Sequence, residues 1–504
     1  MNHSFLFFLL LIAGIGCQST NSPSSSEQHS NLSPPNIIWL MSEDMGQDLG
    51  CYGLEGLRTP VLDKMAVEGI LYQNCIVPNP ICSPGRSAMM TGMHQTRIGA
   101  HNHRSNRKKA LMEGVFPITY YLRQQGYTCI LGHDSVKGKG RKLDLNFRHK
   151  AIGSYDGKTE FGLFDKMGTF DSADQPFFAQ ITLNVTHRGD WWKEVRAQSS
   201  QPVSPEEVVL PPYMADHPKV REQWATYLDQ IEYMDKEVGM ILEELERKNM
   251  LDNSIIFFVG DNGRCDIRGK GYLYDPGVKV PMIAWGKTIT PEVVDDIVST
   301  LDISASILDL AGVTLPETMT ATPLFGENKG AERPYFYSAR DGWDEVDECM
   351  RSITTKQYKY IRNYLPELPW DRAQAYLDFH RPAVHVMRAL HEQGELTEET
   401  SLFFASSKPA EELYDLLKDP HELVNLAQDD EHQKVLQQMR THMNDWQANN
   451  EDMGLLDLNQ RQLNSSRAPK VRDWLQAHQP EAWRRIEEGE IVDQYRNWVQ
   501  EVFN

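Results

Sequence analysis

Continuous apolar runs predict the strands of a buried sheet. Such runs lie at residues 36–41, 127–131, 176–183, 254–260 and 278–285. Apolar residues fill them with little alternation, which is typical of parallel strands that other elements cover on both faces. The chain therefore predicts an α/β fold with a large, mostly parallel sheet.

Segments between these runs show helical periodicity. Residues 219–248 form the longest, with Trp224, Ile231, Val238 and Leu245 on one apolar stripe that we expect to cover the sheet. Shorter helices are predicted at residues 59–70, 115–126 and 298–312.

The pattern changes beyond about residue 330. Short segments at residues 334–339, 350–355 and 358–362 are typical of a small antiparallel sheet joined by turns. Residues 366–408 read as an inserted helical hairpin, and residues 468–504 as one or two packing helices. We therefore predict a second, smaller α+β unit at the C-terminal end.

The N-terminal end predicts export. Residues 5–16 are an apolar run that is too short to span a membrane and is typical of a signal-peptide core. Cys17 follows directly, as in a bacterial lipoprotein signal whose cysteine becomes lipidated. We predict a periplasmic protein or an outer-membrane-anchored lipoprotein, which contacts the membrane only through that lipid. The predicted division is residues 1–17 as signal peptide, 18–35 as linker, 36–330 as main domain and 331–504 as C-terminal subdomain.

Charge and cysteine content narrow the partners. The 504 residues include 51 Lys and Arg against 71 Asp and Glu, a net charge of −20. Such an acidic surface excludes wrapping a nucleic acid, so the positive charge that an anionic ligand needs must be concentrated in a pocket.

Seven scattered cysteines do not make a disulfide framework in a chain of this length. We expect mostly buried thiols with at most one or two bridges.

One stretch combines a cysteine with an anion site. Cys82 stands two residues before Pro84, and Arg86 and the pair Thr91-Gly92 follow. Proline is well placed in the first turn of a helix, so Cys82 is predicted at a helix N-terminus with Arg86 one turn on. Free backbone N–H groups and a guanidinium together suit a tetrahedral oxyanion. A buried, inert thiol at a helix start is the structural alternative.

Two pairs of polar residues follow predicted strands. Glu43-Asp44 comes after the first apolar run, and Asp261-Asn262 comes after the run at 254–260. Ligands bind at the carboxyl ends of strands in open α/β sheets, and parallel neighbours would bring these pairs together. Four oxygen side chains suit Ca²⁺ better than zinc, which favours histidine and cysteine.

Together these motifs resemble the type I sulfatases. In that family the cysteine of the Cys82-x-Pro-x-Arg86 signature is oxidised by a maturation enzyme to formylglycine. Gly85 stands where serine is commoner, and Glu43 stands where the family usually has aspartate. The resemblance covers about residues 35–450. It implies an alkaline-phosphatase-like fold, in which helices sandwich a large mixed sheet. It also implies a Ca²⁺ ion held by Glu43, Asp44, Asp261, Asn262 and the modified residue Cys82.

The resemblance also implies the remaining catalytic residues. His187, just past the strand at 176–183, corresponds to the family's proton donor to the leaving oxygen, and Lys270 to a sulfate ligand. The family's Gly-Lys-x-His motif is replaced by a longer basic loop, in which Lys142 is our first choice for the catalytic lysine and Lys137 the second. The implied catalytic set is Cys82, Arg86, Lys142, His187 and Lys270.

Basic loop residues predict how a sulfated substrate is held. His101, His103, Arg104, Arg188 and Arg340 lie in loops that could converge on the pocket, and an arginine can pair with a uronate carboxylate or a second sulfate. Trp191, Trp192 and the loop at residues 340–345 could contact a sugar face. We predict an exo-acting enzyme on short oligosaccharides from a sulfated, uronate-containing algal or animal polysaccharide.

Two other functions stay open at this point. Sulfate and phosphate esters share a shape, so a phosphoryl or phosphonate monoester hydrolase could use the same scaffold. A catalytically dead, glycan-binding lipoprotein would fit the missing Gly-Lys-x-His motif, although the intact Cys82-to-Arg86 unit favours an enzyme.

Overall fold

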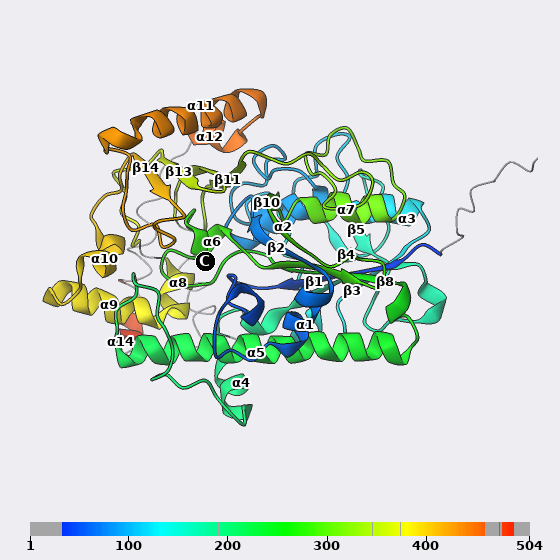
Figure 1. The fold of residues 1–504 in the computed structure, drawn as a ribbon, viewed down its shortest axis with the longest axis horizontal. Helices are drawn as coiled ribbons and strands as arrows, with labels where there is room; N and C mark the ends of the chain where they lie inside the picture. The colour runs from blue at the N-terminus through cyan, green and yellow to red at the C-terminus, as the bar shows by residue number, and fades with distance from the viewer. Residues whose placement is uncertain are drawn as a thin grey trace, which may run out of the picture. The chain divides into compact units, whose positions relative to one another are not determined.

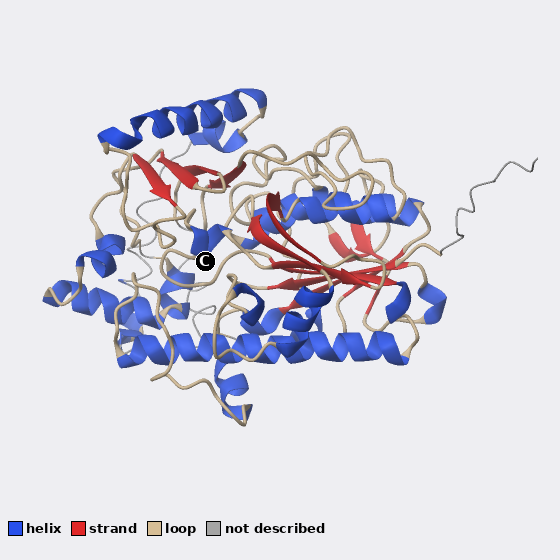
Figure 2. Ribbon diagram, in the orientation of Figure 1, coloured by secondary structure: helices blue, strands red, loops and turns tan. Residues whose placement is uncertain are grey.

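A mixed eight-stranded sheet forms the centre of the described chain (Figures 1 and 2). The computed structural model describes residues 33–189, 191–344, 346–372, 374–458, 473 and 476–487. The predicted signal peptide, Cys17, nearly all of the predicted linker and most of the tail at residues 468–504 lie outside these residues. The strand order is β10-β2-β9-β8-β1-β7-β3-β6. The strands are β1 (Asn36–Ser42), β2 (Ile70–Ile76), β3 (Thr128–Leu131), β6 (Lys166–Met167), β7 (Phe177–Leu183), β8 (Ser254–Gly260), β9 (Met282–Gly286) and β10 (Glu292–Ser299).

The sheet is mostly parallel, as the apolar runs predict. Strand β1 pairs in parallel with both β7 and β8, and β3 pairs in parallel with β7. Only β9, among these strands, runs antiparallel to its neighbours β2 and β8. Every residue of β1, β7 and β8 is buried, which is why their sequences carry no polar face. The predicted α/β fold is confirmed.

Besides the two-residue strand β6, two longer strands escape the sequence pattern. Strand β2 begins at Ile70, so the helix predicted over 59–70 ends earlier, at Glu68. Strand β10 carries exposed acidic residues in its first half and lies at one edge of the sheet. The strand prediction depends on an unbroken apolar run. Both strands are partly exposed, and the polar residues at the exposed positions interrupt that run.

Helices cover both faces of the sheet. In Figure 1, α1 (Pro60–Glu68) and α5 (Pro218–Arg247) lie on one face, and α2 (Cys82–Thr91), α3 (Ile118–Gln124) and α7 (Asp302–Leu310) lie on the other. The predicted stripe of α5, including Trp224, Ile231, Val238 and Leu245, is buried. None of the described helices is long and apolar enough to cross a bilayer.

A four-stranded antiparallel sheet follows in the C-terminal part. Its order is β11-β12-β13-β14, with strands Phe336–Arg340, Met350–Thr354, Tyr358–Asn363 and Glu411–Asp415. Helix α11 (Gln433–Asn449) packs on it through Leu436, Met439 and Met443. The predicted short strands are confirmed, and the predicted boundary between residues 330 and 331 stays a prediction.

Short helices fill the segment that the sequence predicts as an inserted hairpin. They are α8 (Ala375–His380), α9 (Pro382–Gln393) and α10 (Glu398–Ser401). The remaining described elements are α4 (Trp192–Gln198), α6 (Asp275–Val278), α12 (Met453–Leu458), α14 (Pro480–Glu487), and the strand pair β4 (Lys150–Ile152) and β5 (Gly162–Phe164).

A buried lysine ties the small sheet to the main one. Lys359 of β13 is fully buried and forms ion pairs with Asp275 of α6 and with Glu422, whose carboxylate lies 2.9 Å away. Because a buried charge is costly without partners, this network fixes the small sheet against the loop that carries residues 263–277.

The described cysteines carry free thiols. Cys75, Cys82, Cys129, Cys265 and Cys349 are buried and Cys51 is partly buried, and no disulfide links any of them. This matches the expectation of mostly buried thiols.

Candidate active site

Cys82 begins helix α2 at the carboxyl edge of the sheet. Its helix starts where Ile81 has extended backbone, and all ten residues of α2 are buried. Glu43 and Asp44 follow β1, and Asp261 and Asn262 follow β8. The parallel register of β1 and β8 sets Ser42 beside Gly260, so the two acidic pairs meet although they lie more than 200 positions apart in sequence. The sequence prediction that parallel neighbours join these pairs is confirmed.

Backbone hydrogen bonds fix the two strand ends to each other. The Asp261 amide donates to Ser42 O at 2.9 Å, and the Met45 amide donates to Asn262 O at 3.0 Å. The Asp44 amide donates to Asp261 Oδ1 at 3.1 Å. Asp44 itself has a φ of 44°, a left-handed conformation that turns the chain sharply at this point. The carboxylates are therefore placed by rigid backbone.

Three cations neutralise the three carboxylates in this cluster. Arg86 Nε lies 2.9 Å from Asp261 Oδ2, and its Nη2 contacts Glu43. Lys270 Nζ lies 2.6 Å from Asp44 Oδ1, and Lys142 Nζ contacts Glu43 Oε2. All except Lys142 are almost fully buried, so each charge depends on its partner.

Burial and charge shift the pKa values of the cluster. Burial is the largest single effect on Asp44 and opposes its ionisation, but Lys270, His187 and Lys142 together outweigh it and lower the pKa of Asp44. Burial is the larger effect at Asp261 and raises its pKa to about 6 against the influence of Arg86. Burial, with Asp261 close by, raises the pKa of the Cys82 thiol well above its ordinary value. An unmodified Cys82 would be protonated at neutral pH and a weak nucleophile.

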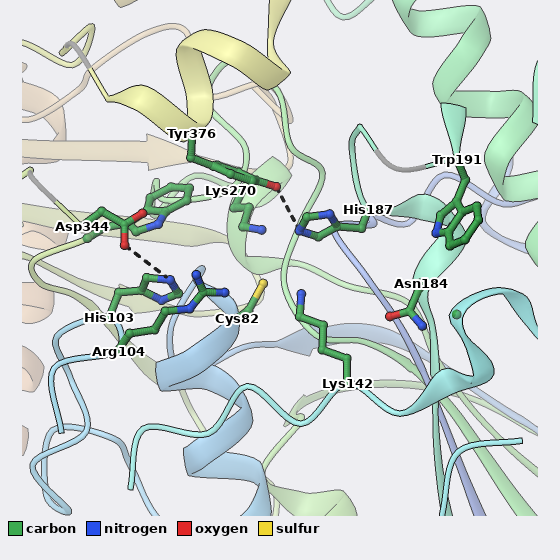
Figure 3. Close-up of a pocket in the computed structure, with 12 residues that line it drawn as sticks. Cys82, His103, Arg104, Lys142, Asn184, His187, Trp191, Lys270, Asp344 and Tyr376 are labelled. Carbon is green, nitrogen blue, oxygen red and sulfur yellow. Dashed lines mark hydrogen bonds and ion pairs between the residues drawn. The ribbon is translucent and has the colours of Figure 1, made fainter. Parts of the chain in front are cut away.

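A cavity of about 500 Å³ opens above Cys82 (Figure 3). Cys82 lies near its centre in the view, between Arg104 on one side and His187 on the other. Cations, aromatic rings and single polar groups share the wall. The lining residues are Cys82, His103, Arg104, Gly138, Lys142, Asn184, His187, Trp191, Lys270, Trp343, Asp344 and Tyr376.

His187 faces this cavity from the end of β7. A short 3-10 turn, Asn184–Thr186, follows the strand, and His187 caps it. Its Nε2 lies 3.1 Å from the Tyr376 hydroxyl and 3.9 Å from Glu43 Oε2. Burial and the charge of Lys142 lower the pKa of His187 to about 3. The ring is thus placed beside Cys82 and the cations.

The oxygen donors of the two strand ends fit a divalent cation. Side-chain ligand atoms of Glu43, Cys82 and Asp261 lie within 4.8 Å of one another. Asn262 Nδ2 donates to Asp44 Oδ1 at 3.0 Å, while Asn262 Oδ1 is buried without a hydrogen-bond partner among the described residues. A buried acceptor without a donor is costly, and a cation would satisfy it. Carboxylate and amide oxygens are the ligands that Ca²⁺ prefers.

Comparison with known families identifies the scaffold. The family model described as "Sulfatase" matches residues 35–313, more than half of the chain. The chain belongs to the sulfatase family. A second model, described as "N-sulphoglucosamine sulphohydrolase, C-terminal", matches residues 263–371 of this sulfatase. The predicted family is therefore confirmed, and with it the assignment as a sulfuric ester hydrolase.

Individual relatives agree with the family match. An ulvan-active sulfatase of Formosa agariphila is 31% identical to this sulfatase over 82% of the chain and 74% of the relative. Among solved structures, a Bacteroides thetaiotaomicron sulfatase superimposes with a TM-score of 0.58 at 19% identity, covering 85% of this chain and 94% of that one. A phosphonate monoester hydrolase from Silicibacter pomeroyi superimposes with a TM-score of 0.56 at 14% identity, covering 84% and 96%. These structural likenesses establish the fold alone.

The structure gathers the core residues that the sequence of this sulfatase predicts. Glu43, Asp44, Cys82, Arg86, Lys142, His187, Asp261, Asn262 and Lys270 form one cluster. Of the predicted substrate-binding residues, His103 and Arg104 line the cavity. Arg104 donates from Nε and Nη2 to the two oxygens of Asp144, each at 3.0 Å.

Three predicted substrate-binding residues are not part of the cavity wall. His101 Nε2 pairs with Asp457 of α12 at 2.9 Å. Arg188 is buried, pairs with Asp266 at 2.9 Å and stacks on Trp192. Arg340 is buried against the ring of Tyr272. The structure therefore does not support direct contact of these three side chains with substrate, because each makes its contacts inside the protein; Arg188 does so although its neighbour His187 faces the cavity.

Some cavity residues had only a weak sequence signal, or none. Trp343 and Asp344 lie in the loop that we expected to contact sugar, and Trp191, unlike the buried Trp192, reaches the wall. Asn184, Gly138 and Tyr376 were not predicted. Asn184 directly follows a predicted strand. It could have been found by the rule that polar residues at the carboxyl ends of strands bind ligands, which also pointed to Glu43-Asp44 and Asp261-Asn262. Tyr376 lies in the predicted helical hairpin, and no local pattern distinguishes it.

The geometry separates the two candidate lysines. Lys142 Nζ reaches Glu43 in the cluster, whereas Lys137 Nζ pairs with Glu194 at 2.8 Å and lies over the rings of Trp191 and Tyr233.

We expect Lys142→Ala to lower kcat for sulfate-ester hydrolysis by about 100-fold or more, because a preorganised charge at the reacting group is lost. Lys137→Ala is the matched control and should stay within about threefold, as for an exposed ion pair worth under about 1 kcal/mol. The measurement is the steady-state kcat of both variants. A larger loss of kcat in Lys137→Ala than in Lys142→Ala would make Lys137 the catalytic lysine.

Proposed function

We propose that this sulfatase removes sulfate from short oligosaccharides of a sulfated, uronate-containing polysaccharide, in an exo manner, with formylglycine made from Cys82 and with Ca²⁺. The observation that carries the proposal is the position of Cys82. It opens a helix inside the cavity, next to three cations and His187. A maturation enzyme that oxidises Cys82 is then a required partner during biogenesis.

Two groups complete the site in this proposal. Glu43, Asp44, Asp261 and Asn262 would hold Ca²⁺ next to residue 82. When present, formylglycine supplies an oxygen nucleophile and the ion supplies positive charge for the sulfate oxygens. The protein itself contributes orientation, charge and a proton donor.

The cations of the chain would bind and orient the sulfate group. Lys142 and Lys270 offer point charges in the cavity wall, and Arg86, whose N–H groups donate to Asp261, Glu43 and other protein acceptors, adds positive charge from behind the wall. Because these groups are fixed by buried carboxylates, little reorganisation is needed as charge develops on the sulfate oxygens. Backbone N–H groups at the start of α2 add to the positive potential.

His187 would protonate the leaving oxygen. His187 lines the cavity, and in Figure 3 its ring lies close to the ends of the Lys142 and Lys270 side chains. A sugar alcohol is a poor leaving group as an alkoxide, so a positioned acid is needed when the S–O bond breaks. Without bound substrate, burial and Lys142 keep His187 neutral at pH 7, so the proton-donating imidazolium would form with the sulfate ester bound, because the negative charge of the ester raises the pKa of His187.

The wall of the cavity supports a sugar substrate. Trp191 and Trp343 offer aromatic faces, and Arg104 offers a cation at the rim. With a net charge of −20, the protein attracts a polyanion only through this local cluster. A cavity of about 500 Å³ falls in the range of sites that enclose a drug-sized ligand, which supports the end of a chain as the substrate. The name of the Formosa agariphila relative supports an algal, ulvan-type polymer.

The alternatives are less well supported. A phosphonate monoester hydrolase has the same fold, so the fold does not distinguish sulfate esters from phosphonate esters. The family match and the 31% identity to a named sulfatase favour sulfate esters. A dead binding protein would not need Arg86, Lys142 and Lys270 gathered around Cys82. Export through residues 1–17, with or without lipid on Cys17, remains our prediction for the N-terminal end.

The proposed function is tested first at residue 82. We expect tryptic mass spectrometry of protein made in a maturase-competent host to show formylglycine in place of Cys82. Cys82→Ala should be inactive and folded, whereas Cys129→Ala, which also removes a buried thiol, should keep its activity. Full activity of protein with unmodified cysteine at position 82 would disprove the proposed nucleophile.

Calcium binding is tested by thermal unfolding. We expect Ca²⁺ to stabilise the protein by about 2.7 kcal/mol when its concentration is 100 times the Kd, because only the folded state gathers the four ligands. Asp261→Ala should lose this calcium dependence. Its basal stability also falls because Arg86 loses a partner, so the measured quantity is the difference with and without Ca²⁺. A stronger response to Zn²⁺, or an undiminished response in the variant, would contradict the calcium site.

Arg104 tests the substrate. We expect Arg104→Ala to raise KM about tenfold for a sulfated, uronate-containing oligosaccharide, because a charged hydrogen bond contributes about 1.5–3 kcal/mol. Hydrolysis of 4-nitrophenyl sulfate should be nearly unchanged. Arg107→Ala is the matched control, since Arg107 also pairs with Asp144 but lies outside the cavity wall. Equal losses on both substrates would place Arg104 at the sulfate group, and preferential release of sulfate from intact polymer would contradict the exo mode.

A further inference from the structure

Tyr376 reaches the active site from the C-terminal part of the chain. It lies on α8, 189 positions from His187 and 332 from Asp44. Its hydroxyl lies 3.1 Å from His187 Nε2 (Figure 3). It also lies 3.4 Å from Asp44 Oδ2. The core residues described above lie before residue 271, whereas Tyr376 belongs to the helical segment at residues 366–408.

The Tyr376 hydroxyl fixes the direction in which the His187 ring faces. Among the described residues, the ring makes its hydrogen bond to this hydroxyl, because Glu43 Oε2 is 3.9 Å away and beyond hydrogen-bonding distance. The bond is made by Nε2, the ring nitrogen that faces Cys82 and Lys270 in the view. Free rotation of the ring would otherwise move Nε2 away from the cavity.

Packing fixes the tyrosine in turn. The ring of Tyr376 lies 4.6 Å from His380 and 5.9 Å from Trp343, measured between ring centroids. The Lys270 ammonium lies 5.1 Å from the Tyr376 centroid, at a distance typical of a cation–π contact. These contacts involve the ring and not the hydroxyl, so a phenylalanine at this position would keep them.

We propose that Tyr376 is a positioning residue for the proton donor His187, supplied by the inserted segment at residues 366–408. This inference rests on the proposed role of His187. A tyrosine hydroxyl can both accept and donate a hydrogen bond, so it fits either state of Nε2. While Nε2 carries the proton, its N–H group is shared in a three-centre hydrogen bond between the Tyr376 oxygen and the leaving oxygen, and the Tyr376 hydrogen turns toward Asp44.

The same hydroxyl also fits the product state. When the S–O bond breaks, its electron pair stays on the leaving oxygen, and that oxygen takes the proton from Nε2. The imidazole becomes neutral, and the lone pair left on Nε2 accepts the Tyr376 hydrogen. The ring therefore stays in place on both sides of the proton transfer. The cost of losing Tyr376 should grow with the need of the leaving group for a proton.

A series of aryl sulfates tests this dependence. We would measure kcat and KM of the parent protein, Tyr376→Phe and His187→Ala with 4-nitrophenyl, phenyl and 4-methoxyphenyl sulfate. The 4-nitrophenolate leaves readily without a proton, whereas the more basic phenolates need one. We expect Tyr376→Phe to leave turnover of 4-nitrophenyl sulfate nearly unchanged and to lower kcat for the two basic phenols about tenfold or more, because a misplaced catalytic group loses about that much or more. KM should change little.

Tyr272→Phe is the matched control. Tyr272 is a buried tyrosine whose hydroxyl donates to Trp370 O at 2.9 Å, so it also holds the inserted segment but does not line the cavity. Its removal should leave the dependence on the leaving group as in the parent protein. Ratios of kcat between substrates do not depend on the folded fraction of a sample, so partial unfolding of a variant does not affect the test.

The outcomes separate this inference from the proposed function. If the parent protein releases no sulfate, or if His187→Ala shows no added dependence on the leaving group, the proposed role of His187 fails and that of Tyr376 fails with it. If His187→Ala shows the dependence and Tyr376→Phe does not, only the role of Tyr376 is wrong. An equal loss on all three substrates in Tyr376→Phe, or the same pattern in Tyr272→Phe, would also overturn it, since either result indicates a merely structural effect.

Discussion

The active site depends on a balance of buried charge. Glu43, Asp44 and Asp261 are removed from water at two strand ends, and a carboxylate in such surroundings is costly unless a cation or a hydrogen-bond donor compensates it. Arg86, Lys142 and Lys270 supply that compensation from three separate segments of the chain. Each segment must therefore pack correctly for any of these charges to be stable, which couples the site to the fold.

Parallel strand pairing is what makes this balance geometrically accessible. Strand β1 lies between β7 and β8, and all three end at the same edge of the sheet. The acidic pairs follow β1 and β8, and His187 follows β7. Helix α2 then directs its N-terminus and Cys82 toward this edge. A single edge thus collects the proposed nucleophile, the proposed proton donor and the proposed metal ligands, while the apolar strands behind it are buried.

The C-terminal part of the chain supplies three residues of the cavity wall. Trp343, Asp344 and Tyr376 reach the cavity from loops and a helix that follow the main sheet in sequence. Asp344 Oδ1 lies 3.7 Å from His103 Nε2, so the two parts also contact each other across the wall. The residues nearest the sulfate would come from segments before residue 271, and Trp343, nearest the sugar, from the later segment. Substrate choice can therefore vary with the wall while the strand ends stay unchanged.

The sequence by itself determined the central strands, the long helix α5 and the chemistry at the strand ends. Those features depend on local patterns: an unbroken apolar run indicates a strand covered on both faces, and polar residues just after it indicate a ligand edge. Asp44 and Asp261 could be assigned in this way, and Cys82 and Arg86 by the pattern of a helix start together with the resemblance to the sulfatase signature. Strands β2 and β10 could not, because partial exposure interrupts their apolar runs.

Only the tertiary structure decided which loop residues face the cavity. His187 and Arg188 are neighbours in sequence, yet one lines the cavity and the other pairs with Asp266 inside the protein. Lys137 and Lys142 lie in one basic loop, yet only Lys142 reaches Glu43. Tyr376 gives no local signal at all and gains its place through contacts with Trp343, His380 and His187. The direction of a loop side chain is set by partners far away in sequence, and local periodicity carries no information about them.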